Sequence, residues 1–443
     1  MSSPFSVHFS ARVFRLRSLP KAALALSFLT AIHGALAAPQ PLTLGEAQLR
    51  AVARSRQLGA QDQAITAANE MAVAAGQRPD PVLKVGIDNL PVSGPDRLSL
   101  GNDFMTMRRI GLSQELTRAD KLHWRSARYQ IEGDKALAQK DVALAAIQRD
   151  TAIAWLEVSY TGQMVGAVSA QATVLRQEIE AAEGAYRGGR GSSADILAAR
   201  SALLALDDRA SEIGRRQRAA HTMLARWTGE DTSVTGAPDI DRIRLDPASL
   251  DTDLAHHPEI AVLNKQEDIA QADANLARAN QRTDWSVEVA FQQRGSAYSN
   301  MVSVGISVPL QWDRKNRQDR ELAAKLAQVE QTKAERDEML REHVAATRSM
   351  IIAWQSGRER TARYTRESLP LASERSQAAL AAYRGGKTTL ADVLAARRGE
   401  VELRLQALEV ELETARLWAQ LNFLFPEGGT AQHSAADSHQ ESK

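Results

Sequence analysis

The feature that most constrains this chain of 443 residues is an internal repeat. The segment AYRGGR at 185–190 recurs as AYRGGK at 382–387, and ADILAAR at 194–200 recurs as ADVLAAR at 391–397. The distance along the chain between the first and second copy is the same for both segments. Self-similarity at one fixed spacing indicates a duplicated structural unit. We therefore predict two structural repeats and a short joint between them: 39–236, 248–426 and the joint 237–247.

Each repeat is predicted to contain the same elements in the same order. A helix comes first, then a strand pair, a very long helix, a tight tip and a second helix. Weaker matches support this plan, such as IAW at 153–155 against IAW at 352–354. The predicted elements are the first helices 44–77 and 250–281, the strand pairs 81–114 and 285–310, the long helices 118–186 and 318–383, and the tips 187–192 and 384–389.

The strands are indicated by apolar residues at every second position. Leu83, Val85 and Ile87 fall on one face of the first strand, and Val302 and Val304 alternate with serine and glycine in the last. Strands of about 9–11 residues with this alternation suit a membrane barrel. Four strands cannot close a barrel, because about eight is the practical minimum. The pattern therefore predicts a barrel shared by several chains, and the alternative is two soluble hairpins packed on a helical body.

The long helices exclude an ordinary globular core. No proline occurs between 96 and 237, and a helix over 118–186 would be roughly 100 Å long. Its counterpart at 318–383 contains Pro370, where we expect a bend. A hairpin of this length has little to pack on except its neighbours. The predicted fold class is therefore mainly α with membrane β, in which long helical hairpins lie side by side as an α-barrel.

The N-terminus has the pattern of a secretory leader. Arg12, Arg15, Arg17 and Lys21 precede an apolar stretch at 22–36. A basic region, an apolar region of about this length and small residues after it are typical of a signal peptide. We predict a signal peptide at 1–38, and we expect the polar tail at 427–443 to be disordered.

Composition removes several classes of function. The chain has no cysteine, so disulfides, thiolate metal sites and a lipid anchor on an N-terminal cysteine are excluded. Its net charge of +1 gives no argument for binding nucleic acid. No catalytic constellation or phosphate-binding motif is present, so we predict no enzyme activity, cofactor or metal site. The pair His256-His257 is interpreted as a helix cap or surface pair.

At the tips the sequence resembles the TolC-like outer-membrane efflux proteins. The motif Tyr-x-x-Gly followed by (Ser/Thr)-x-x-Asp-(Val/Ile)-Leu-x-Ala occurs at 186–199 and again at 383–396. HPEI at 257–260 is similar to the family's Asn-Pro-Glu-Ile, whereas the first repeat departs there with SRQL at 55–58. MRRIG at 107–111 is most similar to the branch that serves heavy-metal resistance pumps. The resemblance covers nearly all of the chain after the leader.

This resemblance implies a homotrimer with a 12-stranded β-barrel in the outer membrane and an α-barrel that extends into the periplasm. Its partners would be a periplasmic adaptor (membrane fusion) protein and an inner-membrane RND-type pump. The implied function is passive export of small toxic solutes, and the branch implies heavy-metal cations. The alternatives are a duct for drug efflux or type I protein secretion and, from another class, a periplasmic coiled-coil adaptor.

The resemblance also implies two groups of site residues. The tips would dock on the adaptor, and one acidic residue beyond each tip would line a pore constriction. As an alternative, Asp195 would form an ion pair with Lys387. Both acids also suit the first turn of a helix, where the macrodipole favours negative charge. The docking candidates are Arg187, Gly188, Gly189, Arg190, Ser192, Arg384, Gly385, Gly386, Lys387 and Thr389, and the constriction candidates are Asp195 and Asp392.

Overall fold

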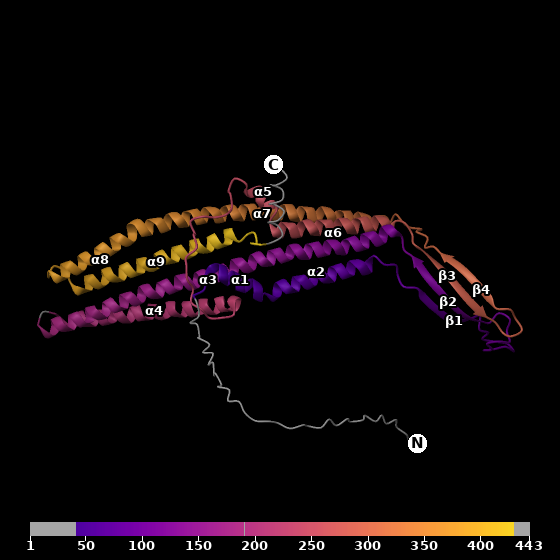
Figure 1. Ribbon diagram of the computed structural model, residues 1–443, viewed down its shortest axis with the longest axis horizontal. Helices are drawn as coiled ribbons and strands as arrows, with labels where there is room; N and C mark the ends of the chain where they lie inside the picture. The colour runs from indigo at the N-terminus through magenta and orange to yellow at the C-terminus, as the bar shows by residue number, and fades with distance from the viewer. Residues whose placement is uncertain (1–40, 190, 429–443) are drawn as a thin grey trace, which may run out of the picture. The chain divides into compact units, whose positions relative to one another are not determined.

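The computed structural model describes residues 41–189 and 191–428. The predicted signal peptide, Arg190 and residues 429–443 of the predicted tail lie outside the described residues. Over the described residues the chain is mainly helical with four strands, as the sequence predicts (Figure 1). The elements are α1 Leu44–Arg54, α2 Arg56–Ala75, β1 Val82–Asp88, β2 Met107–Leu116, α3 Ala119–Arg187, α4 Ser193–Thr228, α5 Leu250–Ala255, α6 Pro258–Asn280, β3 Trp285–Gln293, β4 Met301–Ser307, α7 Gln318–Arg363, a π-helical turn Tyr364–Ser368, α8 Leu369–Arg384 and α9 Leu390–Asn422.

The first helix of each half is divided in two, which corrects the prediction of single helices over 44–77 and 250–281. Ser55 is extended, with ψ of 115°, and its hydroxyl accepts a hydrogen bond from the N–H of Leu58, so a new helix starts there. In the second half His257 has the same position before α6. Pro258 follows at the first helical position, where its missing N–H costs nothing.

The two long helices differ in continuity. α3 runs through 69 residues without interruption. Its counterpart changes from α7 to a π-helical turn and then to α8, with Pro370 just after the turn. The N–H of Leu369 bonds to the carbonyl of Tyr364, five residues back, so the extra residue accommodates a proline that cannot donate. In Figure 1 the orange helix changes direction toward α8, where the sequence predicts a bend.

One tryptophan in each half fixes the segment that precedes the first helix. The indole of Trp155 on α3 is buried and donates to the carbonyl of Leu42 at 2.8 Å. Trp354 on α7 is buried in the same way and donates to the carbonyl of Ile240 at 3.0 Å. Both belong to one hydrophobic core that includes Leu412 of α9. The corresponding tryptophans thus hold both halves to a shared core.

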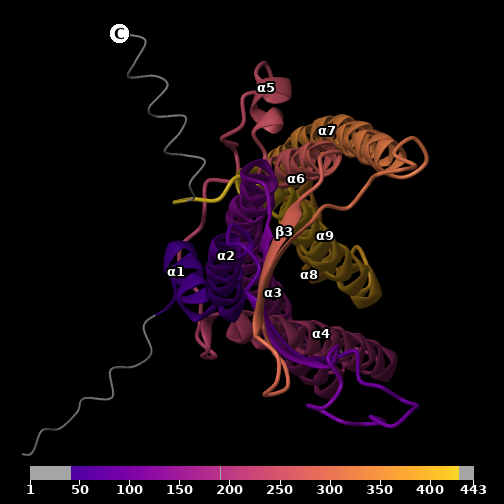
Figure 2. The same cartoon turned by 90° about the vertical axis from the view of Figure 1, so that its right-hand side faces the viewer.

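The four strands form one antiparallel sheet in the order β1-β2-β3-β4. The central pairing joins the halves, with Ile110 of β2 opposite Phe291 of β3. Within the unit that begins at Pro41, the sheet lies at one end of the helices and the hairpin tips at the other (Figure 1). Figure 2 views it from the strand side and shows α1–α4 and α6–α9 as two neighbouring groups of helices. Among the helices of the described residues, none is both long and apolar enough to cross a membrane.

Candidate functional site

One face of the sheet is apolar and exposed across all four strands. The register places Leu83, Leu112, Val289 and Val304 in one row across the sheet. Each of these side chains is exposed in the single chain. An apolar face of this extent on a water-soluble monomer would mark a contact surface. The other apolar members of this face are Val85, Ile87, Ile110, Trp285, Val287, Phe291, Val302 and Ile306.

The opposite face of the sheet is polar and charged. Glu288 on β3 accepts from Lys84 on β1 at 2.6 Å and forms an ion pair with Arg109 on β2. Arg109 also lies 3.8 Å from Asp88. Gln292 continues this face and bonds to Ser303 of β4. One apolar face and one polar face on the same strands suit a sheet between lipid and water.

The first tip reverses the chain within a few residues. Arg187 is the last residue of α3 and is exposed. Gly188 follows it as the C-cap residue, with φ of −84°. Gly189 has φ of +72°, a left-handed conformation that favours glycine. Ser192 then caps α4 through a hydrogen bond from the N–H of Asp195 to its hydroxyl.

The second tip repeats this geometry. Arg384 ends α8, Gly385 has φ of −84° and Gly386 has φ of +69°. The N–H of Lys387 bonds back to the carbonyl of Ala382, and Thr389 caps α9. The sequence prediction gave all four tip glycines the same role. Only the second glycine of each pair, Gly189 or Gly386, has the positive φ that favours glycine over other residues.

Asp195 and Asp392 have the same local role in their two halves. Asp195 accepts from the N–H and the hydroxyl of Ser192, and Asp392 accepts from Thr388 and from the N–H and hydroxyl of Thr389. Each completes a capping box. The hydrogen bonds that Asp392 accepts lower the pKa of this exposed carboxyl, and the bonds from the side chains of Thr388 and Thr389 have the largest effect. The carboxylate of Asp195 is directed to its own cap, and no ion pair joins it to Lys387 among the described residues.

The two tips pack against each other through a small apolar cluster. Leu175 and Ala182 of α3, Ala199 of α4 and Leu390 and Val393 of α9 are buried together. Sequence reasoning missed the ion pair beside this cluster, which joins Arg397 of α9 to Glu178 of α3 at 3.5 Å. Burial raises the pKa of Glu178, and Arg397 opposes this shift. The tips are therefore held as one body rather than as two free hairpins.

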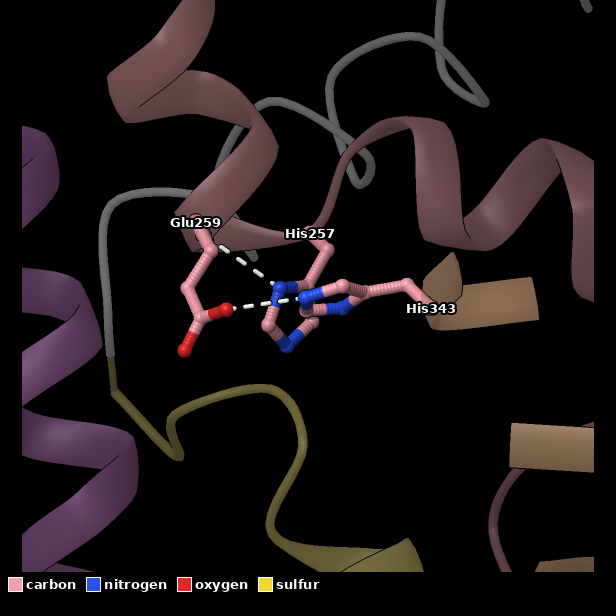
Figure 3. Close-up of side chains that lie close together, drawn as sticks. All are labelled: His257, Glu259 and His343. Atoms are coloured by element: carbon pink, nitrogen blue, oxygen red, sulfur yellow. Dashed lines mark hydrogen bonds and ion pairs between the residues drawn. The ribbon is translucent and has the colours of Figure 1, made fainter. Parts of the chain in front are cut away.

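A second site that sequence reasoning missed lies at the start of α6. His257 caps that helix, as the sequence interpretation proposes, and its Nδ1 accepts from the N–H of Glu259 at 3.3 Å. The fold also places His343 of α7 beside it, with the imidazole 2.9 Å from the Glu259 carboxylate (Figure 3). These three side chains could hold a metal ion, whereas the sequence predicts no metal site, and that prediction stays a prediction. Burial and then the charge of His343 lower the pKa of His257 to about 4.

Comparison with known proteins gives matches in sequence and in structure. No family model matches the chain. The cobalt-zinc-cadmium resistance protein CzcC of Cupriavidus metallidurans is 24% identical over 333 residues, which cover 72% of this chain and 78% of CzcC.

Two solved structures extend the comparison to most of the chain. CusC, whose crystal structures concern transmembrane channel formation, superposes with a TM-score of 0.70 at 14% identity, covering 88% of this chain and 93% of CusC. The outer-membrane channel CmeC of Campylobacter jejuni superposes with a TM-score of 0.73 at 10% identity, covering 89% and 88%. The fold is therefore that of the outer-membrane channels, and the resemblance to TolC-like efflux proteins near the heavy-metal resistance branch is confirmed.

Proposed function

We propose that this chain is the outer-membrane channel component of a tripartite efflux system, and that it exports small toxic solutes, in particular heavy-metal cations. The observation that carries the proposal is the sheet, which among the described residues has one exposed apolar face, one charged face and two unpaired edges, β1 and β4. An unpaired strand edge in lipid costs several kcal/mol for each backbone group. Such a sheet needs further copies of the chain to close it.

A homotrimer meets this requirement with 12 strands. Because the four strands alternate in direction, β1 and β4 are antiparallel to each other. β4 of one copy can therefore pair with β1 of the next and continue the same pattern around a closed barrel. The apolar face then meets outer-membrane lipid, and Lys84, Arg109 and Glu288 face the water-filled interior. The helices extend from this barrel into the periplasm.

The tips are proposed to dock on the periplasmic adaptor protein, which couples the channel to an inner-membrane RND-type pump. Both tips are at the end of the helices away from the sheet, as such a contact requires (Figure 1). Arg187, Arg384 and Lys387 provide exposed cations there. The capping boxes fix the tip backbone in advance, so little ordering is needed on binding.

Asp392 is proposed to form an acidic ring at the periplasmic entrance, to which each of the three chains of the trimer contributes one Asp392 carboxylate. Its low pKa keeps the carboxyl ionised, as a ring that attracts cations needs. Asp392→Asn keeps part of the capping box and removes the charge, so we expect lower cation selectivity in single-channel recordings. Asp195→Asn tests the other constriction candidate in the same way. Unchanged selectivity in Asp392→Asn would remove Asp392 from the constriction, and unchanged selectivity in Asp195→Asn would remove Asp195.

Cross-linking tests the barrel directly, because the chain has no cysteine of its own. We would pair Val85→Cys on β1 with Val302→Cys, Val304→Cys or Ile306→Cys on β4, to scan the register. Oxidation in the outer membrane should link chains into dimers and trimers for at least one pair. Val85→Cys with Val289→Cys on β3 is the control, because β2 separates these strands within one chain. A properly inserted protein that no edge pair cross-links would contradict the shared barrel.

Growth of a deletion strain tests which solutes the channel exports. A deletion strain and its complemented counterpart would be compared on zinc, cadmium, cobalt, copper, silver and a drug panel. Sensitivity confined to metals supports export of metal cations, for which the similarity to CzcC is the present support. Sensitivity to drugs alone, or loss of a secreted protein, favours the other two kinds of duct. Recovery of the chain in the soluble periplasmic fraction would favour the coiled-coil adaptor.

A further inference from the structure

The cluster of His257, Glu259 and His343 joins two helices that are far apart in sequence. His257 is the N-cap of α6, Glu259 belongs to the first turn of that helix, and His343 lies within α7. One ligand atom from each residue lies within 4.8 Å of the other two. The two imidazole rings are 4.8 Å apart between centroids and tilted by 57° (Figure 3). Two nitrogen donors and one carboxylate therefore converge on one point.

The orientation of His257 suits a metal ligand. Its Nδ1 accepts from the N–H of Glu259, and the ring also bonds to the backbone of Leu424. Because Nδ1 is an acceptor, the proton that the ring donates lies on Nε2. A metal-binding histidine usually donates its second ring nitrogen to a carboxylate or a backbone carbonyl, which fixes the ring and its tautomer. The lone pair of Nδ1 lies on the side of Glu259 and His343, and a metal ion bound there would replace the long hydrogen bond of 3.3 Å from the N–H of Glu259.

We propose that His257, Glu259 and His343 bind one divalent transition-metal ion of the Zn²⁺ or Co²⁺ type. Imidazole and carboxylate donors suit such ions, and three protein ligands leave the fourth tetrahedral position to water. Bonds of 2.0–2.1 Å place tetrahedral ligand atoms about 3.3 Å apart. The ligand atoms, which lie within 4.8 Å of one another, must approach by up to about 1.5 Å to reach this distance, and the half-exposed Glu259 side chain can contribute to this movement.

The bound ion would clamp the second half of the molecule. It would tie the start of α6 to α7 and, through His257, to the segment after α9, where Phe425 packs edge-on against the His257 ring. In the first half Ser55 caps α2 at the corresponding position, and a hydroxyl is a poor ligand for these ions. The site is separate from the tips and from the sheet, so it does not depend on the proposed cargo.

Titration of the full-length protein with zinc alone tests the site. The protein would be purified in detergent without a histidine tag and titrated with Zn²⁺ by calorimetry, with Co²⁺ visible absorption as a second readout. We expect one ion per chain and a tetrahedral cobalt spectrum. His343→Gln and Glu259→Gln should each weaken binding at least about tenfold, since even the loss of an outer-shell partner costs about 10–100-fold. His256→Gln removes an exposed neighbouring histidine and should bind as the unmodified protein does.

Hydrogen exchange separates a clamp from incidental binding. At a zinc concentration that just saturates the unmodified protein, zinc should slow exchange of backbone amides at the start of α6 and around His343, and the effect should be much smaller in Glu259→Gln. Glu259 is partly exposed, so this variant keeps the test valid if His343→Gln fails to fold. Binding that survives in both variants, binding that His256→Gln removes, or no binding at micromolar zinc would each overturn the proposal. Failure of the growth test for metal export would leave this result unchanged.

Discussion

The long helix of the first half and its counterpart in the second half have similar lengths and different surroundings. α3 packs on α1, α2, α4, α6 and α9, and its buried residues extend from Lys121 to Ala182. α7 packs mainly on α6, α9 and α5, and its buried residues are Val329, Thr347, Ile351 and Trp354. The interrupted helix is the one with the more exposed surface. Within one chain, a duplicated sequence has thus produced one largely buried helix and one more exposed helix.

This difference explains where a π-helical turn is tolerated. An extra residue in a helix shifts every later side chain around the axis. On α3 that shift would move buried residues out of contact with several neighbours. Between α7 and α8 it affects residues that are mostly exposed, such as Leu371. Burial, rather than the repeat itself, decides how far the two halves can diverge.

The largest expected effect comes from the paired tryptophans. Trp155→Ala should destabilise the protein by about 3–5 kcal/mol, because it removes a side chain that is 1% exposed and its hydrogen bond to Leu42. Trp354→Ala should cost somewhat less, since this side chain is 5% exposed and lies on the helix that packs on fewer neighbours within the chain. Thermal unfolding in detergent measures both. Trp312→Ala, at a residue 89% exposed, is the control. Equal losses of stability in all three variants would contradict the different burial of these tryptophans.

Exchanging the proline tests the helices themselves. Thr173→Pro places a proline in the uninterrupted part of α3 and should cost about 3 kcal/mol or more, through a lost hydrogen bond and a clash with the preceding turn. Thr173→Ala controls for loss of the side chain. Pro370→Ala should change stability by less than 1 kcal/mol or so, because the π-helical turn already accommodates the missing N–H. Equal changes in stability from Thr173→Pro and Pro370→Ala would show that the two long helices do not differ in their tolerance of proline.

Two equivalent arginines beyond the tips should differ in effect. Arg397→Ala should cost about 2 kcal/mol, because it leaves Glu178, whose side chain is 12% exposed, without its cation. Arg200 pairs with Glu183 within the first hairpin at an exposed site, so Arg200→Ala should cost less than about 1 kcal/mol. Hydrogen exchange at the tips is the measurement. A larger effect of Arg200→Ala would refute the view that Arg397 joins the hairpins.

The tip glycines should show a smaller effect that is equal in both halves. Gly189→Ala and Gly386→Ala should each cost about 1–2 kcal/mol, because both residues have positive φ. Gly188→Ala and Gly385→Ala are matched controls with ordinary φ and should be nearly neutral. Thermal midpoints compare the four variants. A loss at Gly385 as large as that at Gly386 would indicate a steric cause instead of a backbone one.

The smallest effect is a dependence on pH at Glu178. Burial raises the pKa of this carboxyl above 4.5, so the folded protein binds the proton more tightly than the unfolded chain does. The contribution to stability is fully present below pH 4.5 and is lost as pH rises through the folded pKa. Glu178→Gln should therefore gain stability relative to the unmodified protein between pH 4.5 and 7. A difference in thermal midpoint that is constant over this range would exclude the effect.

Features set by local sequence were the predictable ones. Alternation at Leu83, Val85 and Ile87 indicates a strand whichever partner it has, and a glycine pair before a capping threonine indicates a tip. The interruption at Ser55 was missed because a serine within a helical pattern has no fixed meaning. It becomes a cap only when its ψ is extended, and this depends on how α1 and α2 each pack on α3.

Contacts between distant segments were beyond sequence reasoning. His343 lies in a long polar helix with no local sign of a partner, and only the packing of α7 on α6 places it beside His257. Arg200 and Arg397 occupy equivalent positions and both pair with a glutamate of α3, but Arg200 does so within its own hairpin and Arg397 does so from the other hairpin. A repeat predicts equivalent local structure. The partners of equivalent residues differ because the two copies occupy different places in one fold.

The unpaired edges of the sheet have a consequence for inheritance. In the proposed assembly each β4 edge is completed by β1 of another chain. One copy with a disrupted β4 therefore leaves a neighbouring chain with an unpaired strand, and the barrel that contains both is defective. An allele with such an edge is expected to be dominant over the intact allele when both are expressed in one cell, whereas an allele that makes no protein is expected to be recessive.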